Sequence, residues 1–234
     1  AIQYILGRTR QPMHDTLQFL QDREYAKLSL KRLQDFYETV SDDTWTRRSE
    51  ERIDADILLE NVTYFYPTTN HGVANVNLTL KHGHKLAFIG ESGNGKSTLL
   101  NIMNGLITPE KGKVIFRHRT NDYHPSECCI GAVSQDGHIF DESILYNITL
   151  SEDAEYPRAR LEDLLRISCL TEVVNDLPDK LHTKLGKNGV TLSKGQFQRI
   201  LIARALYKDC GILIFDEPTS ALDIKTSNEI IDNI

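Results

Sequence analysis

The sequence predicts an α/β fold with an opening segment rich in antiparallel strands. Residues 56–67 and 75–80 alternate apolar and polar side chains, as half-buried strands do. Residues 211–215, GILIF, form a continuous apolar run of the kind found in buried parallel strands. Residues 194–207 carry apolar side chains at helical spacing.

The elements between these landmarks are short. Residues 85–90, KLAFIG, are predicted to form a short buried strand, and residues 96–106 a helix. Residues 112–116 and 130–133 have strand character, and residues 157–170 have the spacing of an amphipathic helix. Strands that alternate with helices in this way favour a parallel core sheet.

The first 55 residues are predicted to lie outside the compact domain. Residues 1–40 place apolar side chains three, four or seven positions apart among many charges, which indicates a long amphipathic helix interrupted at Pro12. Residues 41–55 are highly charged and predict a linker. The compact domain is expected over residues 56–234. The chain starts without methionine and ends inside the helix-like stretch NEIIDNI, so we expect a piece of a longer polypeptide.

Composition narrows the class of protein. The 234 residues are 40% hydrophobic and 26% charged, which is ordinary for a globular domain, and a net charge of −6 gives no general attraction for nucleic acid. No run of about eighteen apolar residues is present. The four cysteines lack the spacing of a disulfide framework or a zinc site, which favours a reducing compartment.

Two pairs of basic side chains are candidates for ligand binding, but each also has a structural explanation. His82 and His84 flank a glycine at a spacing that would suit a metal pair, but no carboxylate or cysteine cluster accompanies them, so we expect a turn between strands. Arg199 and Arg204 lie on the predicted helix 194–207. They are interpreted as solvated groups or as support for a bound phosphate.

Residues 90–98, GESGNGKST, fit the phosphate-loop pattern G-x-x-x-x-G-K-[ST] between a predicted strand and a predicted helix. The glycines let successive N–H groups surround a phosphate, the lysine reaches the β- and γ-phosphates, and the next hydroxyl can bind Mg²⁺. A glycine-rich turn with a surface lysine is the weaker alternative. The residues expected to hold the nucleotide here are Gly90, Glu91, Ser92, Gly93, Asn94, Gly95, Lys96, Ser97 and Thr98.

Residues 216–223, DEPTSALD, directly follow the apolar run 211–215. Asp216, at the carboxyl end of a strand, is placed to hold Mg²⁺ through water, and Glu217 can act as general base toward an attacking water. The alternative is a pair of carboxylates that caps the next loop. A phosphate loop in the same chain favours the catalytic interpretation.

Residues 191–199, TLSKGQFQR, open the predicted helix 194–207. Ser193 is a common N-cap residue, and a helix start leaves unpaired N–H groups at the positive end of the helix dipole. An ordinary cap and an anion-binding surface both remain open from these residues alone.

Taken together, the motifs of residues 56–234 resemble the nucleotide-binding domain of an ABC transporter of the exporter type. In that family an LSGGQ motif opens a helix and closes over the γ-phosphate of ATP bound to the other domain of a head-to-tail dimer. LSKGQ, residues 192–196, matches four of the five positions. The resemblance implies that Ser193, Gly195 and Gln196 contact the nucleotide of a partner domain.

Other positions match the family one at a time. Tyr66 matches the aromatic residue that stacks on adenine, with a cross-strand contact to Tyr64 or Phe65 as the alternative. Gln135 matches the glutamine that touches Mg²⁺ and water and senses the membrane domain. Residues 220–223 match the loop that crosses the dimer interface.

The resemblance to exporters rests on two segments. Residues 177–190, LPDKLHTKLGKNGV, are similar to the stretch that touches the intracellular loops of the membrane domain, and residues 1–40 to the cytoplasmic end of a last transmembrane helix. The resemblance implies ATP and Mg²⁺ as ligands, a transmembrane domain in the same longer chain, no nucleic-acid partner and a location at the cytoplasmic face of a membrane. The implied catalytic residues are Lys96, Gln135 and Glu217, and the implied Mg²⁺ ligands are Ser97, Gln135 and Asp216.

The sequence departs from the family pattern at three places. Lys194 replaces the middle glycine of the signature, at a cost of about 1–2 kcal/mol if φ there is positive and little if it is negative. Lys187 stands where the exporter loop carries an acidic residue. The switch histidine of the family follows a further strand that this chain does not reach, so we expect an exposed sheet edge beside residues 211–215 and slow ATP hydrolysis by the fragment.

Two rival functions remain at this point. The first is a regulatory half that binds ATP without hydrolysing it beside an active partner, which Lys194 favours and Glu217 opposes. The second is a soluble ABC ATPase without a membrane domain. The expected function is the ATP-hydrolysing motor domain of an ABC exporter.

Overall fold

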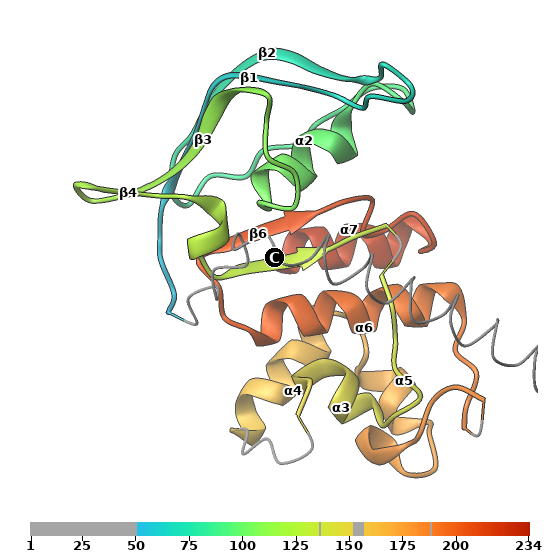
Figure 1. The fold of residues 1–234 in the computed structure, drawn as a ribbon. Helices are drawn as coiled ribbons and strands as arrows, with labels where there is room; N and C mark the ends of the chain where they lie inside the picture. The colour runs from blue at the N-terminus through green and yellow to red at the C-terminus, as the bar shows by residue number, and fades with distance from the viewer. Residues whose placement is uncertain (1–50, 136, 152–156, 188) are drawn as a thin grey trace, which may run out of the picture. The chain divides into compact units, whose positions relative to one another are not determined.

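The structure, a computed structural model, describes residues 51–135, 137–151, 157–187 and 189–234 (Figure 1). The helix expected over residues 1–40 and most of the expected linker lie outside these ranges. The elements in chain order are β1 Asp56–Phe65, β2 Gly72–Leu80, α2 Lys96–Met103, β3 Lys111–His118, β4 Asn121–Tyr123, η1 Pro125–Glu127, β5 Ile130–Val133, α3 Ile144–Thr149, α4 Arg158–Ile167, α5 Thr171–Asn175, η2 Lys180–His182, α6 Lys194–Tyr207, β6 Ile212–Phe215 and α7 Ile224–Asn233.

The opening strands form an antiparallel sheet, as the alternating sequence predicts. Its strand order is β2-β1-β3-β4, and Ile57 in β1 lies opposite Leu80 on one side and Phe116 on the other. The apolar residues of β1 and β3 that point inward pack on Leu99 and Ile102 of α2. This sheet and α2 lie together at one end of the described domain in Figure 1.

The parallel strands predicted from the apolar runs are β5 and β6. Ile130 pairs with Ile212 in parallel register, and Val133 pairs with Phe215. Because the strands are parallel, their carboxyl ends meet at the same edge, and both lead into expected site residues. Of the strands in the described ranges, only β5 pairs with β6, and Leu213 of β6 remains 37% exposed. Among the described residues, the other edge of β6 therefore has no strand partner, in line with the sheet edge expected from the sequence.

The strand predicted over residues 85–90 is not formed. The segment belongs to no sheet of the described residues, and Leu86 and Ile89 are 44% and 95% exposed. A strand exists only where a neighbour accepts and donates its backbone hydrogen bonds. The apolar composition of the segment predicts a strand, but no described strand lies beside it.

The cysteine spacing does not suggest a disulfide framework, but the structure contains one disulfide. Cys129 and Cys210 are joined, with Cα atoms 5.2 Å apart. The two residues precede the neighbouring strands β5 and β6, so strand pairing brings together positions that are 81 residues apart in the chain. Sequence spacing alone does not reveal such a pair. Cys128 and Cys169 take no part in this disulfide.

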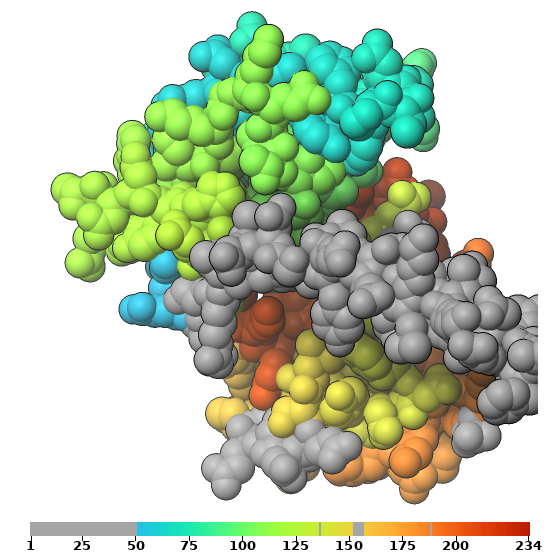
Figure 2. Space-filling view, viewed as in Figure 1, coloured from blue at the N-terminus to red at the C-terminus, as the bar shows by residue number. Residues whose placement is uncertain are grey.

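The helical part follows β5 and packs around α6. α6 contacts α3 and α4 on one side and β5 on the other, so it lies between the helical part and the parallel strands. Ile200 of α6 is fully buried against Ile144 and Ile148 of α3. In the space-filling view, the strand-rich residues (blue to green) and the helical residues (yellow to orange) form separate parts of the visible surface (Figure 2).

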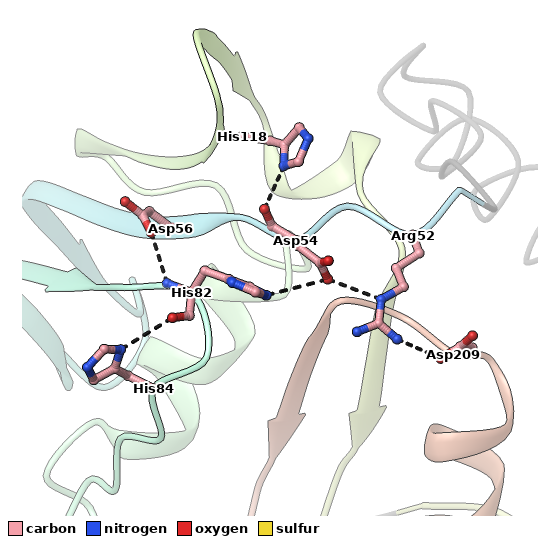
Figure 3. Close-up of polar contacts among 7 residues, drawn as sticks. All are labelled: Arg52, Asp54, Asp56, His82, His84, His118 and Asp209. Carbon is pink, nitrogen blue, oxygen red and sulfur yellow. Dashed lines mark hydrogen bonds and ion pairs between the residues drawn. The ribbon is translucent and has the colours of Figure 1, made fainter.

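A group of ion pairs fixes the chain where it enters β1 (Figure 3). Arg52 Nε lies 3.1 Å from Asp54, and Nη1 lies 2.8 Å from Asp209, just before β6. His82 Nε2 lies 3.6 Å from the same Asp54 carboxylate. His82 is in the turn after β2, and His84 Nδ1 lies 3.3 Å from its carbonyl oxygen, which confirms the turn predicted there. No cluster of metal-ligating side chains occurs in the described ranges.

Candidate functional site

A cavity of about 470 Å³ brings together half of the polar residues singled out for the site from the sequence. It is lined by much of the loop 90–98, by residues at the turn between β1 and β2, and by residues that follow β5 and β6. The lining residues are His71, Gly72, Ser92, Gly93, Gly95, Lys96, Ser97, Thr98, Gln135 and Glu217. The expected residues Tyr66, Gly90, Glu91, Asn94 and Asp216 do not line it.

Glycine is required in the loop at Gly95. Its φ is 80°, in the left-handed region, and a Cβ there would lie only 2.7 Å from the carbonyl oxygen of Gly72. Gly95 is also the N-cap of α2, and no side chain caps this helix. The first N–H groups of α2 therefore remain oriented toward the loop, which is the arrangement that binds a phosphate.

Lys96 is held across this loop. Its Nζ donates to the carbonyl oxygens of Gly90 and Glu91, both at 2.7 Å. An ammonium group has three donors, so one remains beyond these two contacts. The loop thus keeps a positive charge beside the N-terminus of α2, where phosphate oxygens would bind.

The two carboxylates at the end of β6 differ in position. Asp216 continues the parallel pairing, since its N–H donates to the carbonyl of Val133 at 2.8 Å. Glu217 lies in the left-handed region with φ 49°, a conformation that a non-glycine residue adopts at some cost. Its Oε2 lies 3.5 Å from the donor Nε2 of Gln135, across the cavity. The strained turn therefore directs Glu217 toward the side chain that follows β5.

Gln198 of α6 supports this turn and was missed in the sequence. Its Nε2 donates to the carbonyl of Glu217 at 3.3 Å and to Ser220 Oγ at 2.9 Å. Its Oε1 accepts from the N–H of Ala221 at 2.9 Å. Both the amide nitrogen and the amide oxygen of Gln198 therefore form hydrogen bonds with the loop after β6. The only sequence signal was a second glutamine in KGQFQR, whose partners could not be known.

The signature segment forms the predicted cap of α6. The Ser193 side chain accepts from the N–H of Gln196, and the Gln196 side chain accepts from the N–H of Ser193, so both halves of a capping box are present. Lys194 is the first residue of α6 and is not among the residues with positive φ, so it fits without backbone strain. A Cβ at Gly195 would lie 3.0 Å from the carbonyl of Ala221. The segment therefore packs closely on the loop 220–223.

Tyr66 lies just after β1 and contacts a ring of the same strand, not one across strands as the alternative to adenine stacking required. Its ring lies edge-on to Tyr64, with centroids 5.2 Å apart. Its N–H donates to the carbonyl of His71, which closes the loop between β1 and β2. His71, which the sequence did not suggest, lines the cavity in this region.

The donors around the cavity fit a magnesium ion bound together with phosphates. Ser97 and Gln135 both line the cavity and offer a hydroxyl and an amide oxygen, and the Asp216 carboxylate lies next to Glu217. Oxygen donors are those that Mg²⁺ prefers, and it commonly keeps waters and phosphate oxygens in its shell. A small set of protein oxygens is therefore sufficient.

Comparison with known proteins agrees with this geometry. A family model described as ABC transporter matches residues 73–220. The chain is 39% identical over 176 residues to the ATP-dependent lipid A-core flippase of Blochmanniella pennsylvanica (strain BPEN). This alignment covers 74% of this chain and 30% of that protein. The chain is 36% identical over 184 residues to the ATP-dependent lipid A-core flippase of Yersinia pestis bv. Antiqua (strain Antiqua), which covers 77% and 32%.

The fold also resembles a solved structure. A bacterial Atm1-family ABC exporter with ATP bound superposes with a TM-score of 0.71 at 25% sequence identity, over 88% of this chain and 38% of that one. The chain spans about a third of the length of the curated relatives it matches. No helix in the described ranges is both long enough and apolar enough to cross a membrane.

Proposed function

The chain belongs to the ABC transporter family, and on this basis we propose that it is the ATP-hydrolysing motor domain of an exporter. One observation carries the proposal. A single cavity is lined by Lys96 and Ser97 of the phosphate loop, by Gln135 after β5 and by Glu217 after β6. Phosphoryl transfer from ATP to water needs a cation at the phosphates and a base at the water, and these side chains supply both.

The phosphate-binding role falls to the loop and to the start of α2. Lys96 places its ammonium beside the uncapped N–H groups of α2. The β- and γ-phosphates would therefore contact the ammonium and these N–H groups together. The hydroxyl of Ser97, the amide oxygen of Gln135 and the carboxylate of Asp216, directly or through water, would hold Mg²⁺. When bound, this ion neutralises phosphate charge as the leaving group departs.

The hydrolytic role falls to Glu217. The carboxylate would take a proton from water as the water oxygen attacks the γ-phosphorus and the bond to ADP breaks. Gln135, whose Nε2 lies 3.5 Å from Glu217 Oε2, would orient the same water. Gln198 fixes the backbone of this turn, which keeps the base in place before the nucleotide arrives.

A second copy of the domain would complete the site. Ser193, Gly195 and Gln196 do not line the cavity of their own domain, although they lie at the N-terminus of a 14-residue helix. A head-to-tail dimer would bring them to the partner's ATP. The close packing of Gly195 on Ala221 supports this, because it joins the signature segment to the loop expected at that interface.

Conformational changes driven by ATP hydrolysis would be transmitted to a transmembrane domain in the same longer chain. The domain described here would lie at the cytoplasmic face of a membrane. The residues after Gln135 and those around 183–189 would contact that domain. The relatives named above are ATP-dependent flippases, which supports transport as the outcome of hydrolysis. The transported substrate would be selected by the membrane domain.

The test compares the full-length protein in membrane with its Glu217→Gln variant. We expect steady turnover of Mg²⁺-ATP by the wild type and a loss of about 100-fold or more in the variant, because general base catalysis contributes on that order. Binding of ATP should survive in both proteins. The matched control is Glu162→Gln, an exposed residue of α4 that pairs with Arg158, and it should retain full turnover.

Two results would contradict the proposal. Wild-type protein that binds ATP without hydrolysing it would identify a regulatory half, and turnover that persists in Glu217→Gln would assign the base to another residue. The backbone at Lys194 gives the regulatory half no support, since the lysine fits the first turn of α6 without strain.

A further inference from the structure

Arg204 is a half-buried cation in the middle of α6 whose contacts are almost all to oxygen atoms of one other segment. Nε donates to the carbonyl of Asn147 at 2.7 Å, Nη1 to the carbonyl of His138 at 2.7 Å and Nη2 to Asn147 Oδ1 at 3.1 Å. The guanidinium also lies over the ring of Phe140, 5.6 Å from its centroid. Burial lowers the pKa of Arg204.

This charge is balanced by dipoles. No ion pair to a carboxylate is formed by Arg204 within the described ranges, so the carbonyl and amide oxygens must stabilise it. A half-buried charge is costly without such partners. A guanidinium reaches three oxygens at once because its donors form a rigid planar fork, which an ammonium group lacks.

The acceptor, Asn147, is itself fully buried and organises the segment that precedes it. Its Nδ2 donates to the carbonyls of Phe140, Glu142 and Ser143 at 3.0, 3.3 and 3.0 Å, and its Oδ1 accepts from the N–H of Phe140 at 2.8 Å. The same Oδ1 accepts from Arg204. One buried amide thus closes residues 140–147 into a compact turn, and one arginine attaches that turn to α6.

The attached segment connects two parts of the proposed site. Residues 138–147 follow Gln135 closely and lead into α3, while α6 carries the signature residues at its N-terminus. We propose that Arg204 and Asn147 are positioning residues, which hold the segment after Gln135 on α6 so that Gln135 and the signature end of α6 move as one body during ATP turnover. This inference rests on the proposed ATPase function.

The discriminating variant is Arg204→Lys. It keeps the positive charge and most of the apolar stem, but it removes the fork that spans three oxygens. A role in charge or in general packing would be largely preserved by lysine. A role in fixing the orientation of residues 138–147 would not.

Arg160 provides a matched control. It lies in α4, donates to the carbonyl of Tyr207 at the C-terminal end of the same helix α6, and stacks over the Tyr207 ring at 5.4 Å. Its chemistry therefore resembles that of Arg204, but its hydrogen bond and ring contact are to Tyr207 and not to residues 138–147. Arg160→Lys should weaken the helical part to a similar degree without changing the relation of Gln135 to α6.

The experiment uses the full-length protein and measures kcat and KM for ATP together with hydrogen exchange at the Phe140 amide. For Arg204→Lys we expect kcat to fall about tenfold with KM unchanged within about twofold, because no phosphate contact is lost. The Phe140 amide should exchange at least about tenfold faster, because its acceptor Asn147 loses its anchor. Arg160→Lys should leave both quantities as in the wild type.

Equal losses of kcat in both lysine variants would overturn the inference, as would an unchanged Phe140 amide in Arg204→Lys. If Arg204→Lys does not fold, Phe140→Leu replaces it, since that side chain is 43% exposed and the backbone bonds of the turn remain. A fall in kcat of about twofold at an unchanged melting temperature is then expected, and no fall would overturn the inference. Absence of turnover in the wild type would contradict the proposed function, while the exchange measurement would still decide whether Arg204 holds the turn.

Discussion

The helical region, residues 138–207, and the phosphate-binding region, residues 85–98, use apolar sequence in opposite ways. In the helical region Ile200 is completely buried, and the buried amide of Asn147 makes all of its hydrogen bonds. In the phosphate-binding region Ile89 is 95% exposed although it ends the apolar run 86–89. The difference shows that a helix forms its backbone hydrogen bonds within itself, whereas a strand depends on a neighbour.

The comparison extends to the polar groups. Arg204 is surrounded by fixed oxygen acceptors, while Lys96 lines a cavity and donates to carbonyl oxygens of the loop that carries it. Glu217 takes a positive φ at the mouth of the same cavity. The groups with structural roles are thus enclosed by protein, and the groups proposed for chemistry face the space where a ligand would bind.

The strongest test of this comparison is a pair of isoleucine substitutions in the 234-residue chain. Ile200→Ala should lower the free energy of unfolding by about 2–5 kcal/mol, because it leaves a cavity in a packed core. Ile89→Ala should change it by about 0.5 kcal/mol or less, because the side chain is exposed. Urea denaturation followed by circular dichroism measures both.

Equal losses of unfolding free energy in Ile200→Ala and Ile89→Ala would contradict the comparison between the two regions. A large cost at Ile89 would mean that the segment 85–90 is buried in solution, against the structure. Repeating Ile89→Ala in the full-length protein sharpens the result. A cost that grows there would mean that this segment gains a neighbouring strand, as the sequence predicts.

A smaller but still substantial effect is expected at the Cys129–Cys210 disulfide, which joins the strands beneath the cavity. Oxidised wild type should be more stable than the Cys129→Ala, Cys210→Ala double variant by about 2–4 kcal/mol, because the bond limits the unfolded chain. Reductant should remove most of this difference. Denaturation with and without reductant measures it.

Free thiol counting provides the control for that prediction. The oxidised chain should expose two alkylatable cysteines after unfolding, Cys128 and Cys169, and the reduced chain four. Equal stability of the oxidised and reduced chains would show that the bond does not constrain the strands. At the proposed cytoplasmic location the reduced form is expected to dominate.

Much of the fold was predictable because local pattern and structure agree. The helix 194–207 has the predicted limits, and the run GILIF forms the parallel strand β6. The loop 90–98 was recognisable because phosphate binding requires glycine and lysine at fixed spacing. These features depend on neighbours in the sequence, so the sequence contains their signal.

The remaining features depend on residues far apart in the chain. The partners of Gln198 and Arg204 are 19 residues or more away, and the two bonded cysteines are separated by 81 residues. Arg204 was expected to be solvated or near a phosphate, but it points into the protein. The pattern of apolar residues on α6 gives the face of the helix but not the oxygens that meet an arginine there.

The smallest expected effect concerns the N-cap of α7, an exposed polar contact beside the proposed site that contrasts with the buried amide of Asn147. Asp223 accepts from the N–H of Thr226 at 3.0 Å and from its hydroxyl at 2.7 Å, and the backbone N–H bond in particular lowers the pKa of Asp223. A carboxylate with a lowered folded pKa stabilises the fold above its unfolded pKa, about 4, and loses this contribution as the pH falls through the folded value.

Asp223→Asn keeps a residue that caps well but does not titrate. We therefore expect the difference in urea midpoint between wild type and variant to favour the wild type at pH 6 and to shrink as the pH falls toward 3. Asp232→Asn, a change of the same kind in the last turn of α7, should show no such cap-dependent trend. A midpoint difference that stays constant from pH 6 to pH 3 would mean that the charge of Asp223 does not contribute, and that the exposed cap, like the buried amide, acts through hydrogen-bond geometry alone.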